Sequence, residues 1–126
     1  MSELLYLNMN DVLDLHARQV ERFGGAAGIR DAGLLDAAIN RPQSGYYADV
    51  FEEAAALWES LTMNHCFVDG NKRVGFASVY VFLRLNGVRV VASEAKTLDF
   101  ILTSIETGTF MKDNLDAWLR ANTAAS

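Results

Sequence analysis

The chain has 126 residues, of which 51% are hydrophobic and 21% are charged. This length and balance are typical of one folded domain and exclude a disordered chain, whose composition is more polar. Eleven lysines and arginines oppose sixteen acidic residues, which gives a formal net charge of -5. Direct nucleic-acid binding is therefore not expected, because sequence-independent binders present broadly basic surfaces.

The cysteine content and the apolar segments indicate in which cellular compartment the protein is expected. Cys66 is the single cysteine, which excludes an internal disulfide and suits a reducing environment. The first seven residues lack the basic region and long apolar run of a signal peptide. The most apolar stretch, residues 74–85, is too short to cross a bilayer and is interrupted by Gly75 and Arg84. We therefore expect a cytoplasmic protein without a membrane partner.

Helix start and stop signals recur along the chain, in the form of Asn, Asp or Ser caps and of Gly or Pro terminators. The predicted boundaries, in chain order, are Asn8 or Asn10 to Phe23, Asp31 to Pro42, residues 51–64, residues 72–86, Ser93 to Gly108, and residues 111–122. The fourth segment is apolar on nearly every side, which predicts the buried centre of a bundle.

Two of the segments outside the predicted helices have an expected structure of their own. Residues 43–49 are expected as an exposed loop or short hairpin, and residues 123–126 as a frayed tail. The sequence thus predicts an all-α fold, a single compact bundle of about six helices that forms one domain over residues 1–126.

The segment between the third and fourth predicted helices, residues 65–73, reads HCFVDGNKR. Asn71 is a good N-cap for the fourth helix, which places Lys72 and Arg73 in its first turn. Cations there oppose the helix dipole by roughly 0.3–1 kcal/mol each, so the pair is unfavourable unless an anion binds beside it. Backbone N–H groups, the flexible Gly70 and two cations together predict a phosphate site.

Two further side chains of this segment suit phosphoryl transfer. Asp69 offers oxygen ligands for Mg²⁺ held jointly with phosphate, and His65 can accept the proton of an attacking hydroxyl. A structural interpretation stays open on spacing alone, in which Asp69 pairs with Lys72 or Arg73 and residues 69–71 form only a turn. The doubled cations are what that interpretation explains least well.

Other candidate residues are expected to be structural. Cys66 is predicted to be a small buried side chain rather than a nucleophile, and His16 a packing residue of the first helix rather than a metal ligand. Arg30 and Arg84 are expected as surface charges, although either can assist phosphate binding.

The segment closely resembles the Fic/Doc signature, His-x-Phe-x-Asp/Glu-x-Asn-x-Arg. Shorter matches to the death-on-curing (Doc) branch of this family are GG at 24–25, GIRD at 28–31, LL at 34–35, RPQ at 41–43 and FLRLNG at 82–87. The resemblance implies a six-helix Fic core that uses ATP and Mg²⁺ and transfers part of the nucleotide to a protein hydroxyl.

The resemblance also implies roles for single residues. His65 matches the general base and Asp69 the acidic residue that positions metal and phosphate. The anion hole is matched by Gly70, Asn71 and Arg73. At Lys72, Fic adenylyltransferases usually carry glycine, whereas Doc toxins carry lysine. A long cation there favours the γ-phosphate in the cradle, which implies a kinase; adenylyl transfer is the alternative.

The Doc branch further implies a toxin that phosphorylates a threonine of elongation factor Tu and blocks translation. No inhibitory Ser/Thr-x-x-x-Glu-Gly/Asn stretch is present, which implies an antitoxin whose C-terminal part folds as a helix on an apolar groove near the site. Residues 43–49 match the flap that docks the target, with Tyr46 and Tyr47 as contacts. A non-catalytic Fic-like binding protein and, less favoured, a metal-dependent ribonuclease remain alternatives.

Overall fold

The computed structural model describes residues 3–126, so the first two residues of the N-terminal stretch considered above lie outside the described part. Six α-helices account for most of the chain: α1 (Met9–Phe23), α2 (Ala32–Asn40), α3 (Val50–Met63), α4 (Asn71–Leu85), α5 (Glu94–Glu106) and α6 (Lys112–Ala121). The remaining elements are a 3-10 turn, η1 (Arg41–Ser44), and two short strands, β1 (Val88–Val90) and β2 (Thr123–Ala125). The predicted all-α bundle is confirmed.

Four of the helices begin at a polar cap residue. The side chains of Asn8, Asp31, Asp49 and Ser93 accept backbone N–H groups from the first turns of α1, α2, α3 and α5. At Asn8 the bonds are reciprocal, because the Asp11 carboxylate also accepts the Asn8 N–H at 2.8 Å. This capping box decides between the two candidate asparagines at the start of α1.

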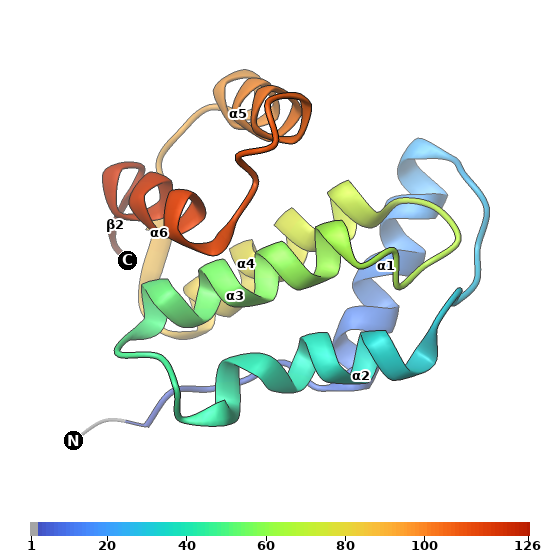
Figure 1. Cartoon of the computed structure of the whole chain (residues 1–126), viewed down its shortest axis with the longest axis horizontal. Helices are drawn as coiled ribbons and strands as arrows, with labels where there is room; N and C mark the ends of the chain where they lie inside the picture. The colour runs from blue at the N-terminus through green and yellow to red at the C-terminus, as the bar shows by residue number, and fades with distance from the viewer. Residues whose placement is uncertain (1–2) are drawn as a thin grey trace.

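The helices α3 and α4 lie side by side at the centre, with α1, α2 and α6 packed around them (Figure 1). Trp58 of α3 is fully buried and stands among four aromatic rings, each with its centroid within 6.0 Å. Those rings belong to Phe76 of α4, Phe100 of α5, Phe110 of the loop between α5 and α6, and Trp118 of α6. Tilted and edge-on aromatic packing of this kind joins α4, α5 and α6 to the central helix.

The helix α4 is not buried on every side, contrary to the prediction. Tyr80 is 41% exposed and Leu85 45% exposed. On the Tyr80 side, a groove of about 600 Å³ lies between α1, α4 and α5. We call it the α1/α4/α5 groove; its lining includes Leu15, Phe23, Lys72, Arg73, Tyr80 and Leu98. None of the helices in residues 3–126 combines the length and apolarity needed to cross a membrane.

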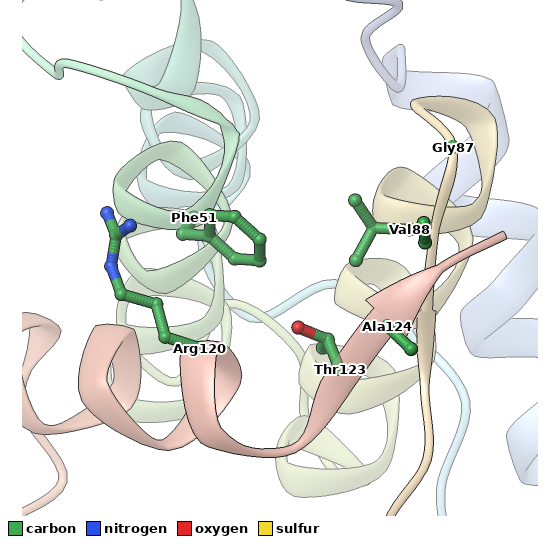
Figure 2. A pocket seen from close by; sticks show the side chains of 7 residues that line it. Phe51, Gly87, Val88, Arg120, Thr123 and Ala124 are labelled. Carbon is green, nitrogen blue, oxygen red and sulfur yellow. The ribbon is translucent and has the colours of Figure 1, made fainter.

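The C-terminal tail is ordered, so the prediction that residues 123–126 are frayed is wrong. β2 pairs antiparallel with β1 over three residues, and the Ser126 N–H donates to the Gly87 carbonyl at 2.8 Å. This ribbon, the start of α3 and the end of α6 enclose a hollow of about 420 Å³ (Figure 2). The Arg120 guanidinium beside it already donates to both oxygens of Asp49, at 2.9 and 2.7 Å. The hollow contains none of the residues of the 65–73 motif.

The packing of α4 on α3 leaves no room for a side chain at Gly75. A Cβ placed on Gly75 would lie 2.3 Å from Oγ1 of Thr62, a side chain that is 4% exposed. We expect Gly75→Ala to destabilise the protein by about 1–3 kcal/mol through overpacking, measured by urea unfolding. Helix propensity alone predicts the opposite, a gain of about 1 kcal/mol. Emptying the space of Oγ1 in Gly75→Ala/Thr62→Ala should restore stability, whereas Gly75→Ala/Thr62→Val, which places a methyl group there, should not.

Candidate active site at the junction of α3 and α4

His65 follows the end of α3 in an unusual backbone conformation. α3 ends at Met63, Asn64 caps it, and His65 adopts φ 51°. Within residues 3–126 it is the one non-glycine residue with positive φ. Glycine is favoured at this position, because a Cβ in the left-handed region crowds the following carbonyl. The structure thus holds an exposed imidazole at a position that is unfavourable for any side chain.

The segment 24–31, between α1 and α2, lies against the motif. Ile29 and Phe67 form an antiparallel bridge, in which the Val68 N–H donates to Gly28 O at 3.0 Å and the Arg30 N–H to Cys66 O at 2.8 Å. The Arg30 side chain also turns toward the motif and donates to main-chain carbonyls there. This packing could not be predicted from the sequence, because the two segments are far apart in the chain.

Asp69 is held by backbone donors from both segments. Its Oδ1 accepts the Gly70 N–H at 2.9 Å and its Oδ2 the Ala26 N–H at 3.2 Å. A Cβ on Gly25 would lie 2.8 Å from Oδ2, so the turn at residue 25 requires glycine. A carboxylate offers about four acceptor positions, and Asp69 therefore keeps capacity for a cation. None of the ion pairs in residues 3–126 joins it to Lys72 or Arg73, as the structural interpretation required.

His16 supports the motif from α1. It is 4% exposed, its ring stacks on Phe67 with centroids 3.8 Å apart, and its Nε2–H donates to the Asp69 carbonyl at 2.7 Å. The expected packing role is confirmed, and the packing partner is the candidate active-site loop. Cys66 is likewise buried, and desolvation raises the pKa of its thiol, which suits a packing side chain better than a nucleophile.

The start of α4 corrects the capping prediction. Gly70, with φ 77°, is the N-cap in place of Asn71, and no side chain in the described part of the chain caps the N–H groups of the first turn. Asn71 turns back instead: its Oδ1 accepts the Phe67 N–H and its Nδ2 donates to the Phe67 carbonyl, both at 3.0 Å. The positive end of α4 therefore has backbone donors without a side-chain acceptor, an arrangement suited to an anion.

Lys72 and Arg73 are exposed in this first turn and both line the α1/α4/α5 groove. The Arg73 guanidinium lies 4.8 Å from the ring centroid of Phe23, a cation–π contact that holds it on the groove side. Neither His65 nor Asp69 lines that groove. The structure thus places the two cations on one side of the α4 start, and the carboxylate and the imidazole in the loop that precedes it.

Tyr46 and Tyr47 are not brought to the motif. They precede α3, whereas His65 follows it, and the 14 residues of α3 span about 20 Å; Figure 1 shows these two loops at opposite ends of the helix. Tyr46 is 84% exposed, and the Tyr47 hydroxyl accepts Arg41 Nε at 2.7 Å. Residues 43–49 contain the end of η1 and a loop, with no hairpin.

The left-handed His65 gives a testable difference between two variants that both lack the imidazole. We expect His65→Gly to be more stable than His65→Ala by about 1–2 kcal/mol, because only alanine retains a Cβ in the left-handed region. Urea unfolding of the two variants measures it. Ala17→Gly, at an exposed position of α1, is the control and should destabilise by about 0.5–1 kcal/mol. Equal stability of the two His65 variants would contradict the conformation described.

Comparison with known proteins agrees with the motif. The sequence profile of the Fic/DOC family matches residues 6–83, which include the whole junction. The chain is 37% identical over 127 aligned positions to the Toxin Doc of Mycolicibacterium smegmatis, covering 96% of this chain and 95% of that protein. It is 34% identical over 92 positions to the Protein kinase doc of Escherichia phage P1, covering 70% and 73%. The resemblance predicted from residues 65–73 is confirmed, and the chain belongs to the Fic/Doc family.

Proposed function

We propose that this protein is a Doc-type toxin that transfers the γ-phosphate of ATP to a protein hydroxyl, with His65 as the general base. The observation that carries the proposal is the uncapped start of α4 beside Lys72 and Arg73, directly after a loop that holds Asp69 and exposes His65. The relatives named Toxin Doc and Protein kinase doc support the toxin and kinase parts.

In this proposal the nucleotide phosphates bind at the start of α4. The first-turn N–H groups, Lys72 and Arg73 hold phosphate oxygens, and Gly70 offers no side chain that would obstruct them. Asp69 fits a magnesium ion, because its oxygens accept only backbone N–H groups. In residues 3–126 no three His, Cys, Asp or Glu side chains converge, so phosphate oxygens would have to supply further ligands to such an ion. The ion, when bound, neutralises phosphate charge.

The proposed reaction is an in-line phosphoryl transfer. The hydroxyl oxygen of the target bonds to the γ-phosphorus, and the bond from that phosphorus to the bridging oxygen breaks, so that ADP leaves. The proton of the hydroxyl passes to the His65 imidazole. The exposed position of His65 leaves it accessible to a side chain of another protein.

The target segment has a main-chain edge to pair with at Ile29. The bonds of the bridge to residues 66–68 are made by Gly28 and Arg30, so the N–H and C=O of Ile29 face the opposite side. An extended segment added there would lie about 4.8 Å away, beside the motif, and its alternate side chains would turn toward the loop. We therefore place target docking at Ile29 rather than at Tyr46 and Tyr47.

The transfer is tested with γ-labelled ATP and elongation factor Tu as the first candidate target. We expect the target to gain about 80 Da on a threonine, and His65→Ala to lower the rate by about 10²–10⁴-fold with the fold intact. Mass spectrometry measures the mass gain of the target, and circular dichroism shows whether the variant keeps its fold. A gain of about 329 Da would instead indicate adenylyl transfer, and no turnover on any translation factor would favour a non-catalytic binding protein.

The α1/α4/α5 groove suits an antitoxin helix. Its walls are mainly apolar, and Arg22, Lys72 and Arg73 are among its lining residues. An amphipathic helix that carries carboxylates toward these cations would match both properties. Such an occupant would cover Lys72 and Arg73, which the nucleotide also uses, so that binding and inhibition would coincide. Toxin and antitoxin would then meet in the cytoplasm.

Two leucines of α5 provide a matched test of the groove. Leu98 lines it and is 56% exposed, whereas Leu102 is 47% exposed and lies outside it. We expect Leu98→Asn to weaken binding of a candidate antitoxin by about tenfold, from the loss of roughly 1.5 kcal/mol of apolar burial, and Leu102→Asn to leave it unchanged. Calorimetry measures both. Equal effects of the two variants would place the partner elsewhere.

A further inference from the structure

Arg30 makes an unusual pair of contacts at the end of α3. Its Nε donates to the carbonyl of His65, and its Nη2 donates to the carbonyl of Asn64 at 3.2 Å. These carbonyls lie at the negative end of the helix dipole and have no helical partner, so a guanidinium is a favourable neighbour. Arg30 is exposed, as expected from the sequence, and its guanidinium is engaged with main-chain oxygens.

The two contacted carbonyls belong to the two peptide groups that flank the His65 Cα. The Asn64 carbonyl lies in the peptide plane before it and the His65 carbonyl in the plane after it. Rotation about φ or ψ of His65 moves one plane relative to the other. A rigid, planar guanidinium bonded to both therefore restrains both angles at once.

The restraint acts on His65, a residue whose backbone conformation is unfavourable. His65 has φ 51°, a conformation that costs a non-glycine residue about 1–2 kcal/mol. Without a restraint, relaxation to negative φ would turn the imidazole in another direction. The backbone of Arg30 is itself anchored, because its N–H and that of Asp31 donate to the Cys66 carbonyl at 2.8 and 3.1 Å. The guanidinium is therefore fixed relative to the turn it holds.

We propose that Arg30 is a positioning residue, which orients the His65 imidazole for proton transfer by holding its left-handed backbone conformation. The proposal rests on the proposed function for the role of His65 as base. Arg30 is not among the residues that line the groove beside Lys72 and Arg73, and its side chain donates to carbonyls instead, which distinguishes this role from that of a phosphate ligand. Loss of Arg30 should therefore affect the chemical step and leave nucleotide binding unchanged.

The kinetic test compares Arg30→Ala and Arg30→Lys with wild type, using γ-labelled ATP and elongation factor Tu. We expect kcat to fall about tenfold or more in both variants, with KM for ATP within about twofold of wild type. Lysine keeps the charge at the end of α3 but lacks the fork, so its melting temperature should fall less than that of Arg30→Ala while kcat stays low. Arg18→Ala, in an exposed pair with Asp14, should match wild type. A raised KM for ATP with unchanged kcat would overturn the proposal, and so would a wild-type kcat in Arg30→Lys.

A second test needs no activity and separates this proposal from the proposed function. Arg30→Ala is introduced into His65→Ala and into His65→Gly, and the melting temperatures are compared. We expect the larger loss in the alanine background, because glycine accepts positive φ without the restraint. Equal losses would show that Arg30 holds the loop generally and does not act on this turn. Should Arg30→Ala fail to fold, Arg30→Gln replaces it in both tests.

Discussion

The juxtaposition of two helix ends with opposite dipoles gives the site its chemistry. α3 ends and α4 begins within the short loop of residues 64–70, and the two helices lie side by side because Gly75 has no side chain to hold them apart. Unpaired carbonyls at the end of α3 are negative, and unpaired N–H groups at the start of α4 are positive. Arg30 donates to the two carbonyls that directly follow α3, those of Asn64 and His65, whereas no side chain in residues 3–126 caps the N–H groups of α4. An anion is therefore favoured at only one of the two ends.

The parts of the site that are contiguous in the chain were predictable from the sequence. His65, Asp69 and the two cations lie within nine residues, and their chemistry can be inferred without knowing the fold. Helix starts were predictable for the same reason, since a cap bonds a residue two or three positions away. Asn71 was misjudged because the same amide can cap a helix or fold back on a loop, and only the turn geometry at Gly70 decides between them.

The supporting contacts were not predictable, because they join residues that are distant in sequence. Arg30 reaches a carbonyl 35 positions away, Ala26 a carboxylate 43 positions away, and His16 a carbonyl 53 positions away. Local periodicity contains no information about such pairs. It also indicates which helix faces are apolar but not which are covered, and for this reason the open side of α4 was predicted to be buried.

The local rules that this chain breaks coincide with the residues proposed to act. His65 occupies a glycine position, Lys72 and Arg73 oppose the dipole of α4, and Leu98 exposes an apolar side chain beside them. Each feature is unfavourable in the isolated chain and would be relieved by a ligand or partner. Arg73 is the residue that both the nucleotide and a partner in the groove would contact. Its guanidinium rests on Phe23 at the groove side, and in the proposed function it also binds phosphate. A partner with carboxylates in the groove would retain Arg73 there, so that inhibition would not require the partner to reach His65.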